Sequence, residues 1–298
     1  MSQSVGFKYS LKLGVLVGID NAAAKMILLL SNIAGENLSN SVILGHQRNH
    51  IGIGLRRRLS SELNITMESL SGKYADSFIG AVGAENFQIL DISDYEQAQI
   101  IHDLSTPIPQ NLKGKFSVVM DIGTSEHVYN VSQSLSNIRD LCAENGQVLM
   151  LSPANHYLGH GFYQFSPELF FRAFGRDYGF EIHALYLIKN SLFKEKWYEL
   201  TDPKVLKRRG TIDTGRRCYI GVIATKISEP QVLQDPFQSD YIEAWNEVKI
   251  SRMGSIYLKS PFYLRRVLDF TVIALLSRVR NRIKPKKFEW KNGSFTPK

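Results

Sequence analysis

The sequence predicts an α/β fold built on a doubly wound, mostly parallel sheet. Several short runs are apolar throughout and rich in β-branched residues, as expected for strands that are buried on both faces of a parallel sheet. Segments with helical patterns fall between these runs, which is typical of βαβ units with right-handed crossovers. With 298 residues, of which 44% are hydrophobic, the chain is long enough to bury a full core.

The predicted elements follow one another in a regular order. The strands are predicted at 41–45, 86–91, 99–103, 116–121, 147–151, 181–186 and 219–224. Helices are predicted at 55–63, 132–142 and 167–177, the last with Ser166 as N-cap and Pro167 in its first position. This alternation defines a Rossmann-like α/β domain from about residue 41 to residue 226.

Charge divides the chain into unequal parts. Residues 249–298 contain thirteen Lys or Arg and only two acidic residues, so the net charge of +8 belongs to this tail. Residues 1–248 are slightly acidic, which gives no electrostatic sign of nucleic-acid binding. We therefore predict three parts: a helical N-terminal extension (1–40), the α/β domain (41–226) and a basic C-terminal extension with an amphipathic helix (227–298).

Several predicted strands end in glycine or aspartate. Gly45, Asp91, Asp103 and Asp121 each stand where an apolar run stops. The carboxyl ends of the strands in an open α/β sheet line one crevice, and ligands bind there. The sequence therefore predicts a ligand site at this edge of the sheet.

Four segments with these strand ends carry a resemblance to a known family: SVILG, FQILDISDYE, IIHDLSTPIP and KFSVVMDIGTSEHVYNV. Together with LCAENGQVLMLSP, they make residues 41–226 resemble the class I S-adenosylmethionine-dependent methyltransferases. The resemblance implies that Asp91 binds the ribose hydroxyls of the cofactor and that Asp103 faces the adenine amino group. It also implies that Asp121 and the turn of Gly123 and Thr124 border the methionine part of S-adenosylmethionine and the substrate, and Gly45 is a further candidate cofactor-binding residue.

The first loop departs from the pattern of that family. Gly45 is followed by His46, Gln47 and Arg48, and glycines return only at Gly52 and Gly54. Two alternatives to an active methyltransferase therefore stay open. One is a non-catalytic binding or scaffold protein that keeps the fold, and the other is a nicotinamide-binding protein, although no glycine fingerprint opens a helix after the first strand.

Glu126 and His127 follow the fourth predicted strand and are the candidate catalytic residues. A histidine at the crevice could act as a general base on a substrate hydroxyl because its pKa lies near working pH. The alternative is structural: a carboxylate at a helix N-terminus beside a packed imidazole. With this pair, the resemblance implies methyl transfer to a hydroxyl of a small or glycan-type substrate.

The polar, aromatic loop 155–164 follows the fifth predicted strand. His156, Tyr157, His160 and Tyr163 are its candidate substrate-binding residues, since loops after strand ends often carry function. His156 and His160 have the i, i+4 spacing of a helical metal motif, but Gly159 and Gly161 argue against a helix. No metal site is predicted.

The remaining predictions concern location. The two cysteines form no Cys-x-x-Cys motif, and residues 1–30 match no secretory signal, so we expect a cytoplasmic protein with reduced thiols. In the tail, apolar residues 270–277 are flanked by arginines and are too few to span a bilayer, which takes about 20 residues. This helix either lies on an anionic membrane surface, which would make the protein peripherally membrane-associated, or packs on the domain.

A vesicle assay separates these two interpretations of the tail. If residues from about 261 to 287 form a basic membrane-surface helix, the protein binds anionic vesicles and binds neutral vesicles poorly. Binding falls steeply as salt rises, because charge attraction is screened over about 8 Å at physiological ionic strength. Truncation after Ser260 then abolishes binding and leaves the domain folded. A truncated protein that aggregates or loses its thermal transition would show instead that the helix belongs to the core.

Overall fold

A ten-stranded sheet runs through the computed structural model. The structure describes residues 18–189, 195–206, 214–230, 236–242, 287–291 and 294–297. The order of the strands across the sheet is β10-β9-β7-β6-β8-β5-β4-β1-β2-β3. Their bounds are β1 (Ser41–Leu44), β2 (Gln88–Asp91), β3 (Ile100–Ile101), β4 (Phe116–Ile122), β5 (Cys142–Asn155), β6 (Phe180–Lys189), β7 (Lys196–Glu199), β8 (Cys218–Lys226), β9 (Lys287–Lys291) and β10 (Ser294–Pro297).

The sheet has a parallel half and an antiparallel half. Strands β3, β2, β1, β4 and β5 pair with their neighbours in parallel. β8 is antiparallel to both β5 and β6, so β6 points in the same direction as the parallel half. Strands β1 to β6 therefore share one direction, which confirms the predicted α/β class and its mainly parallel sheet.

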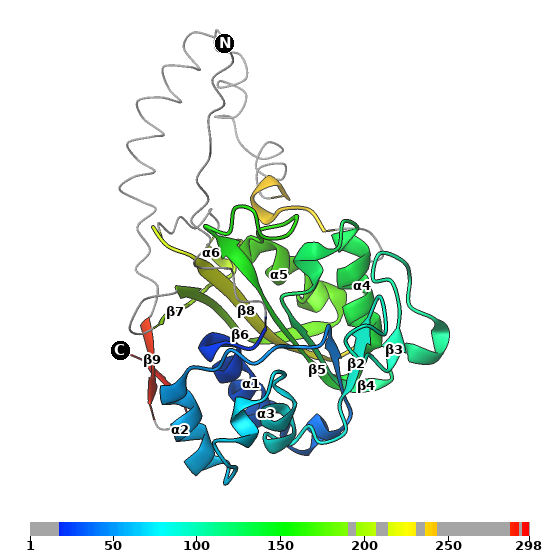
Figure 1. The fold of residues 1–298 in the computed structure, drawn as a ribbon. Helices are drawn as coiled ribbons and strands as arrows, with labels where there is room; N and C mark the ends of the chain where they lie inside the picture. Colours follow the sequence, from blue (N-terminus) through cyan, green and yellow to red (C-terminus); the bar gives the residue numbers. More distant parts are fainter. Residues whose placement is uncertain are drawn as a thin grey trace, which may run out of the picture.

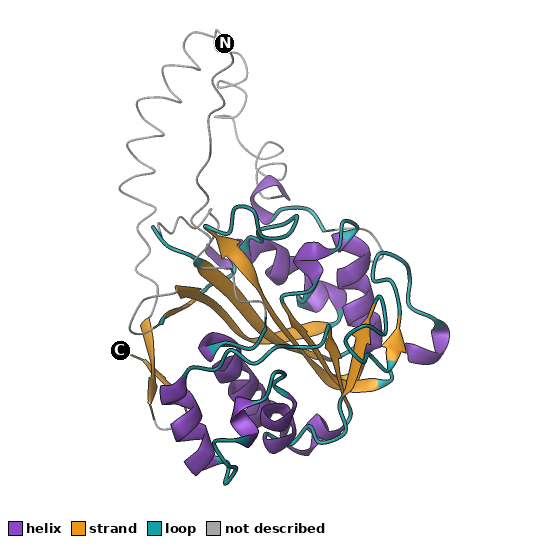
Figure 2. Ribbon diagram, viewed as in Figure 1, coloured by secondary structure: helices purple, strands orange, loops and turns teal. Residues whose placement is uncertain are grey.

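Helices cover both faces of the sheet (Figures 1 and 2). In the view of Figure 1, α1, α2 and α3 lie below the sheet, and α4 and α5 lie above it. Their bounds are α1 (Asn21–Ala34), α2 (Ile53–Glu62), α3 (Asp76–Ala81), α4 (Val131–Leu141) and α5 (Pro167–Ala173), with the short α6 at Pro203–Leu206. The doubly wound arrangement predicted from the sequence is thus confirmed.

Alternate residues of the central strands feed two separate cores. In β4, Val118 and Met120 belong to the cluster beneath α1, α2 and α3, whereas Val119 belongs to the cluster beneath α4 and α5. All three side chains are completely buried. Successive side chains of a strand point to opposite faces. When both faces are buried, nearly every position of the strand is therefore apolar.

The direction of the crossovers changes between β1 and β4. The order 3-2-1-4-5 of the parallel half is the first part of the doubly wound order, in which ligands bind at this switch point outside the carboxyl ends of the strands. Asp91 ends β2, Asp103 follows β3, and Asp121 lies near the end of β4. The three carboxylates therefore lie at the same edge of the sheet, as predicted.

Several elements differ from their predicted bounds. β5 begins at Cys142 directly after α4, five residues before the predicted start at residue 147, and it includes Asn145 with φ of 61°. β7 was not predicted, because its four residues, two aromatic between two charged, give no alternating pattern. β9 and β10 extend the sheet beyond β7 from a segment that was predicted only as a basic tail.

The N-terminal extension contains the predicted helix through Met26 and Leu30. α1 begins with Asp20 as N-cap, whose carboxylate accepts hydrogen bonds from the N–H groups of Ala22 and Ala23. The apolar face of α1 is completely buried against the sheet, so this helix completes one of the two cores. Where the domains begin and end stays a prediction.

The predicted membrane-surface helix at 261–287 lies outside the described residues, apart from its last residue. No helix among the described residues has both the length and the apolar character needed to cross a membrane.

Truncation of a buried α1 side chain measures how far this helix supports the domain. Ile27 is completely buried, so Ile27→Ala is expected to lower the free energy of unfolding by about 2–5 kcal/mol, because a cavity remains in the core. Asn32→Ala, at an exposed position of the same helix, is the control and should change it by less than about 0.5 kcal/mol. Chemical denaturation measures both values, and equal stabilities would mean that α1 unfolds independently of the sheet.

Candidate functional site

Gly45 lies at the switch point and brings three loops together. Its φ is 73°, a left-handed conformation that glycine adopts without strain. A Cβ atom at this position would lie 3.1 Å from Oγ1 of Thr124 and 4.0 Å from Oδ2 of Asp91. Oγ1 of Thr124 donates a hydrogen bond of 2.7 Å to the carbonyl of Leu44. The half-buried backbone of Gly45 therefore lies close to side chains that follow or end β4 and β2.

The two residues after Gly45, His46 and Gln47, have large polar side chains that are buried. The His46 ring stacks on Tyr74, with 3.5 Å between ring centroids, and contacts the Asp76 carboxylate at 3.0 Å. Gln47 is buried and donates through Nε2 to the carbonyl of Leu44. Its Oε1 atom has no hydrogen-bond partner among the described residues. A buried acceptor without a donor is costly, and a ligand that carries an N–H group would relieve that cost.

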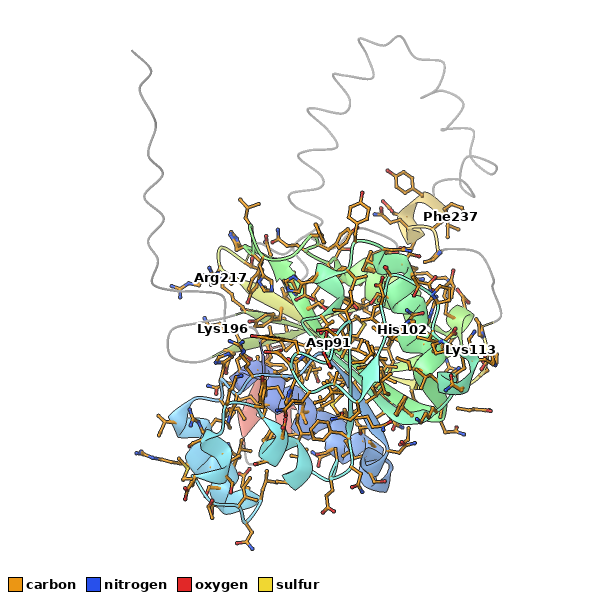
Figure 3. All side chains as sticks on the ribbon, turned by 45° about the vertical axis from the view of Figure 1, so that its right-hand side comes forward. Asp91, His102, Lys113, Lys196, Arg217 and Phe237 are labelled. Atoms are coloured by element: carbon orange, nitrogen blue, oxygen red, sulfur yellow. The ribbon has the colours of Figure 1, made fainter. Side chains whose placement is uncertain are left out.

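Asp91 and Asp103 occupy the other side of the switch point. Asp91 is half-buried, and its Oδ1 atom accepts a hydrogen bond of 2.6 Å from the N–H of Ile92. Figure 3 shows Asp91 near the centre of the molecule, and the N–H of His102 donates to its carbonyl. Asp103 is exposed, and hydrogen bonds from the hydroxyl and N–H of Ser105 lower the pKa of its carboxyl.

Asp121 lies beneath the site rather than facing it. Its side chain is completely buried and accepts hydrogen bonds from the N–H groups of Thr124 and Ser125. Burial, and after it the nearby carboxylate of Glu126, raise the pKa of the Asp121 carboxyl to about 7. The resemblance implied that Asp121 contacts the cofactor directly. Because its side chain is buried, Asp121 instead holds the following loop, which contains Gly123 and Thr124, through hydrogen bonds.

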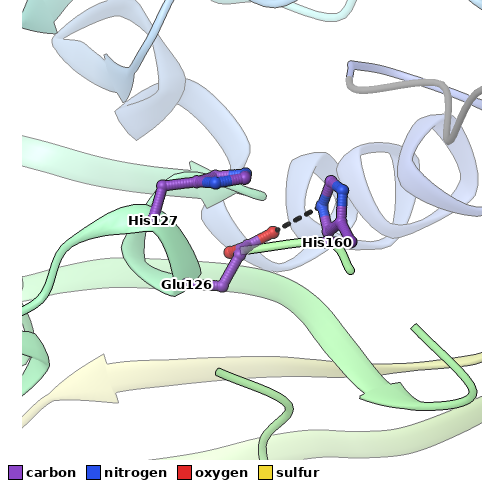
Figure 4. Close-up of side chains that lie close together, drawn as sticks. All are labelled: Glu126, His127 and His160. Atoms are coloured by element: carbon purple, nitrogen blue, oxygen red, sulfur yellow. Dashed lines mark ion pairs between the residues drawn. The ribbon is translucent and has the colours of Figure 1, made fainter. Parts of the chain in front are cut away.

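Glu126, His127 and His160 come together although they lie on two loops. One potential ligand atom of each residue lies within 4.8 Å of those of the other two. Figure 4 shows the Glu126 carboxylate with the two imidazole rings around it, and its Oε1 atom is 3.5 Å from Nε2 of His160. Glu126 is 1% exposed, and its Oε2 atom has no hydrogen-bond partner among the described residues.

Close backbone contacts join the loop after β5 to the loop after β4. The N–H of Phe162 donates a hydrogen bond of 2.7 Å to the carbonyl of Glu126. Gly161 has φ of 67°, and a Cβ atom there would lie only 2.8 Å from the same carbonyl oxygen. Glycine is therefore required at this position, and it sets His160 beside Glu126.

The other predicted residues of this loop are not equivalent. His156 is exposed and takes no part in the Glu126 cluster. Tyr157 is 3% exposed and packs against Tyr219 beneath the Arg217 guanidinium, so its ring offers no open face to a substrate. Burial and the neighbouring Tyr219 raise the pKa of the Tyr157 hydroxyl. The structure therefore contradicts the substrate-binding role predicted for Tyr157, because its ring is packed in the core. Tyr163 is half-buried, and its hydroxyl donates to the carbonyl of Tyr129.

Two features of the site escaped the sequence analysis. Gln47 was regarded only as a departure from a glycine-rich loop, whereas its burial directly after β1 leaves an acceptor at the switch point. The spacing rule related His160 to His156, whereas the structure sets it beside Glu126 and His127. The strand order could have indicated this cluster, because β4 and β5 are parallel neighbours and the loops that follow them lie side by side.

Solved structures that resemble this chain include several methyltransferases. A SAM-dependent methyltransferase from Aquifex aeolicus shares 9% identity over 70% of this chain and 94% of its own length, with a TM-score of 0.36. The 1,6-didemethyltoxoflavin-N1-methyltransferase of Burkholderia thailandensis, solved with S-adenosylhomocysteine, shares 14% identity over 70% of this chain and 80% of its own, with a TM-score of 0.36. The MccD protein shares 10% identity over 71% and 99%, with a TM-score of 0.42.

No model of a known protein family matches the sequence, and no curated protein matches it. At these identities, the structural similarity concerns the fold and assigns no role to individual residues.

A substitution at Gly45 tests the conformation on which the site depends. Gly45→Ala is expected to lower the free energy of unfolding by roughly 1–2 kcal/mol, since an alanine with this positive φ is strained. Gly54→Ala is the control, because a Cβ atom there meets no atom within 4 Å and alanine favours the helix. Thermal and chemical denaturation compare the two variants. Equal stability of both would show that the backbone at Gly45 is not constrained.

Proposed function

We propose that this protein is an S-adenosylmethionine-dependent methyltransferase that acts on a hydroxyl group of a small or glycan-type substrate. The observation that carries the proposal is the site at the switch point, where Gly45, Thr124 and the Asp91 carboxylate meet at the ends of β1, β4 and β2. In an open α/β sheet this is the position at which nucleotide cofactors bind.

The residues at this site suit the chemical groups of S-adenosylmethionine. Asp91 has an Oδ2 atom beside Gly45, and a carboxylate there accepts hydrogen bonds from the two ribose hydroxyls. Oε1 of Gln47 is a buried acceptor without a donor among the described residues, which suits the ammonium of the methionine part. Gly45 permits close approach of the ligand to the backbone. When bound, the cofactor supplies a methyl group on a positively charged sulfur.

The loops around the site support a substrate with flat or ring-shaped apolar faces. Tyr129 is 79% exposed and Phe162 is 65% exposed, and their ring centroids lie 5.7 Å apart. Sugar rings and small aromatic compounds stack on such side chains. The exposed imidazole of His127 lies two residues before Tyr129 in the sequence and is the candidate base for the substrate hydroxyl.

The nicotinamide alternative is disfavoured by the strand order. The dinucleotide-binding order 3-2-1-4-5-6 places a sixth parallel strand beside the fifth. Here the antiparallel β8 occupies that position and separates β5 from β6. The non-catalytic alternative has an observation in its favour, since the side chains of His46 and Gln47 occupy the first loop. Cofactor titration separates an active methyltransferase from that scaffold.

Isothermal titration of the purified full chain with S-adenosylmethionine, and with its demethylated product, tests the proposal. Asp91→Ala is expected to weaken binding by roughly 1.5–3 kcal/mol, the usual value of hydrogen bonds to a charged group. Asp94→Ala changes an exposed carboxylate a few residues further along the same loop and should bind with unchanged affinity.

Two outcomes would contradict these expectations. A wild-type protein that binds neither compound at millimolar concentration would be a non-catalytic member of the fold. Binding that is equally tight in wild type and in Asp91→Ala would assign the ribose contact to another residue.

A further inference from the structure

We propose that Glu126, His127 and His160 bind one divalent transition-metal ion, of the class of zinc, iron(II) or cobalt(II), beside the proposed cofactor site. The three side chains come from the loops after β4 and β5, and their ligand atoms lie within 4.8 Å of one another. The backbone contacts of Gly161 and Phe162 with the Glu126 carbonyl hold the two loops together.

The distance between Glu126 and His160 fits two ligands of a shared ion better than a direct hydrogen bond. Oε1 of Glu126 and Nε2 of His160 are 3.5 Å apart, whereas hydrogen bonds between such groups have lengths of about 2.7–3.2 Å. Metal bonds from His nitrogen and carboxylate oxygen are about 2.0–2.2 Å long, so two ligands of one tetrahedral ion lie roughly 3.4 Å apart. The rings of His127 and His160 are nearly perpendicular, with 4.9 Å between their centroids.

A second observation indicates that the Glu126 carboxylate binds a cation. Its Oε2 atom is buried and has no hydrogen-bond partner among the described residues, and the only ion partner described for Glu126 is His160. A simple Glu126–His160 ion pair leaves this oxygen without a partner. A buried carboxylate is stabilised only when it is paired, hydrogen-bonded or coordinated to a metal. A cation at the centre of the cluster would contact the carboxylate and both imidazoles.

The donor set selects the class of metal. Two imidazoles and one carboxylate form the ligand set of non-haem iron(II) sites and of catalytic zinc sites, which keep further positions open. Magnesium and calcium prefer oxygen ligands throughout. His127 is exposed and Glu126 is buried, so the open positions of the ion face the solvent side of the site.

The consequence for chemistry rests on the proposed function. At an open position, the ion would lower the pKa of a substrate hydroxyl, which would release its proton to solvent. Its oxygen then forms a bond to the methyl carbon, the bond from that carbon to sulfur breaks, and the positive sulfur becomes a neutral thioether. In this arrangement His127 would be a metal ligand, and solvent rather than His127 would accept the proton of the hydroxyl.

Cobalt(II) is the probe for the site, because its visible absorption reports coordination by nitrogen and oxygen ligands. The full chain is first freed of metal with a chelator and then titrated with cobalt(II), and zinc(II) is added in competition. We expect one ion per chain, with affinity reduced at least about tenfold in Glu126→Gln, His127→Ala and His160→Ala. His156→Ala removes an exposed histidine of the same loop that is outside the cluster, and it should bind cobalt with unchanged affinity.

Three results would contradict the proposed metal site. Absence of binding at millimolar cobalt, or equal loss of affinity in His156→Ala, would show that the cluster is not the ligand set. His127 is exposed, so its variant keeps the fold even where Glu126→Gln does not, and unchanged affinity in His127→Ala and His160→Ala would also refute the proposal. Titration of the same samples with S-adenosylmethionine tests the proposed function separately. A protein that binds cobalt but not the cofactor would retain the metal site and lose its role in methyl transfer.

Discussion

The parallel pairing of β1 with β4 is the constraint on which the candidate site depends. This pairing sets Leu44 opposite Asp121, so the two strands end at the same level. The crossovers leave in opposite directions on either side of it, and no helix or loop has to cover the gap between the strand ends. Gly45 and Thr124 then meet across that gap, and the hydroxyl of Thr124 satisfies the carbonyl of Leu44.

Two buried carboxylates extend this arrangement from β4 towards β5. Asp121 receives the N–H groups of Thr124 and Ser125, so it is satisfied within its own loop. Glu126 is equally buried but has one oxygen without a hydrogen-bond partner among the described residues, and its carboxylate raises the pKa of Asp121. Burial of two acidic groups so close together is unfavourable without a cation or a proton. The chemistry of the site is therefore concentrated at Glu126.

How far the candidate site could be predicted differs from residue to residue. Asp91 and Gly45 could be found because each ends an apolar run, and every parallel strand ends at the same edge. Tyr157 could not be judged, because the sequence does not reveal that Tyr219 and Arg217 cover its ring. His160 was placed in the correct loop, but its neighbour in space depends on the tight contact between Gly161 and the Glu126 carbonyl.

The sequence by itself determined the class of fold, the parallel strands β1 to β5 and the edge at which their ends meet. It could do so because burial on both faces leaves an apolar pattern that depends only on local order. Only the tertiary structure decided that β8 lies antiparallel between β5 and β6, and that Glu126, His127 and His160 form one cluster. These features depend on contacts between residues far apart in the chain, and such contacts leave no periodic pattern in the sequence.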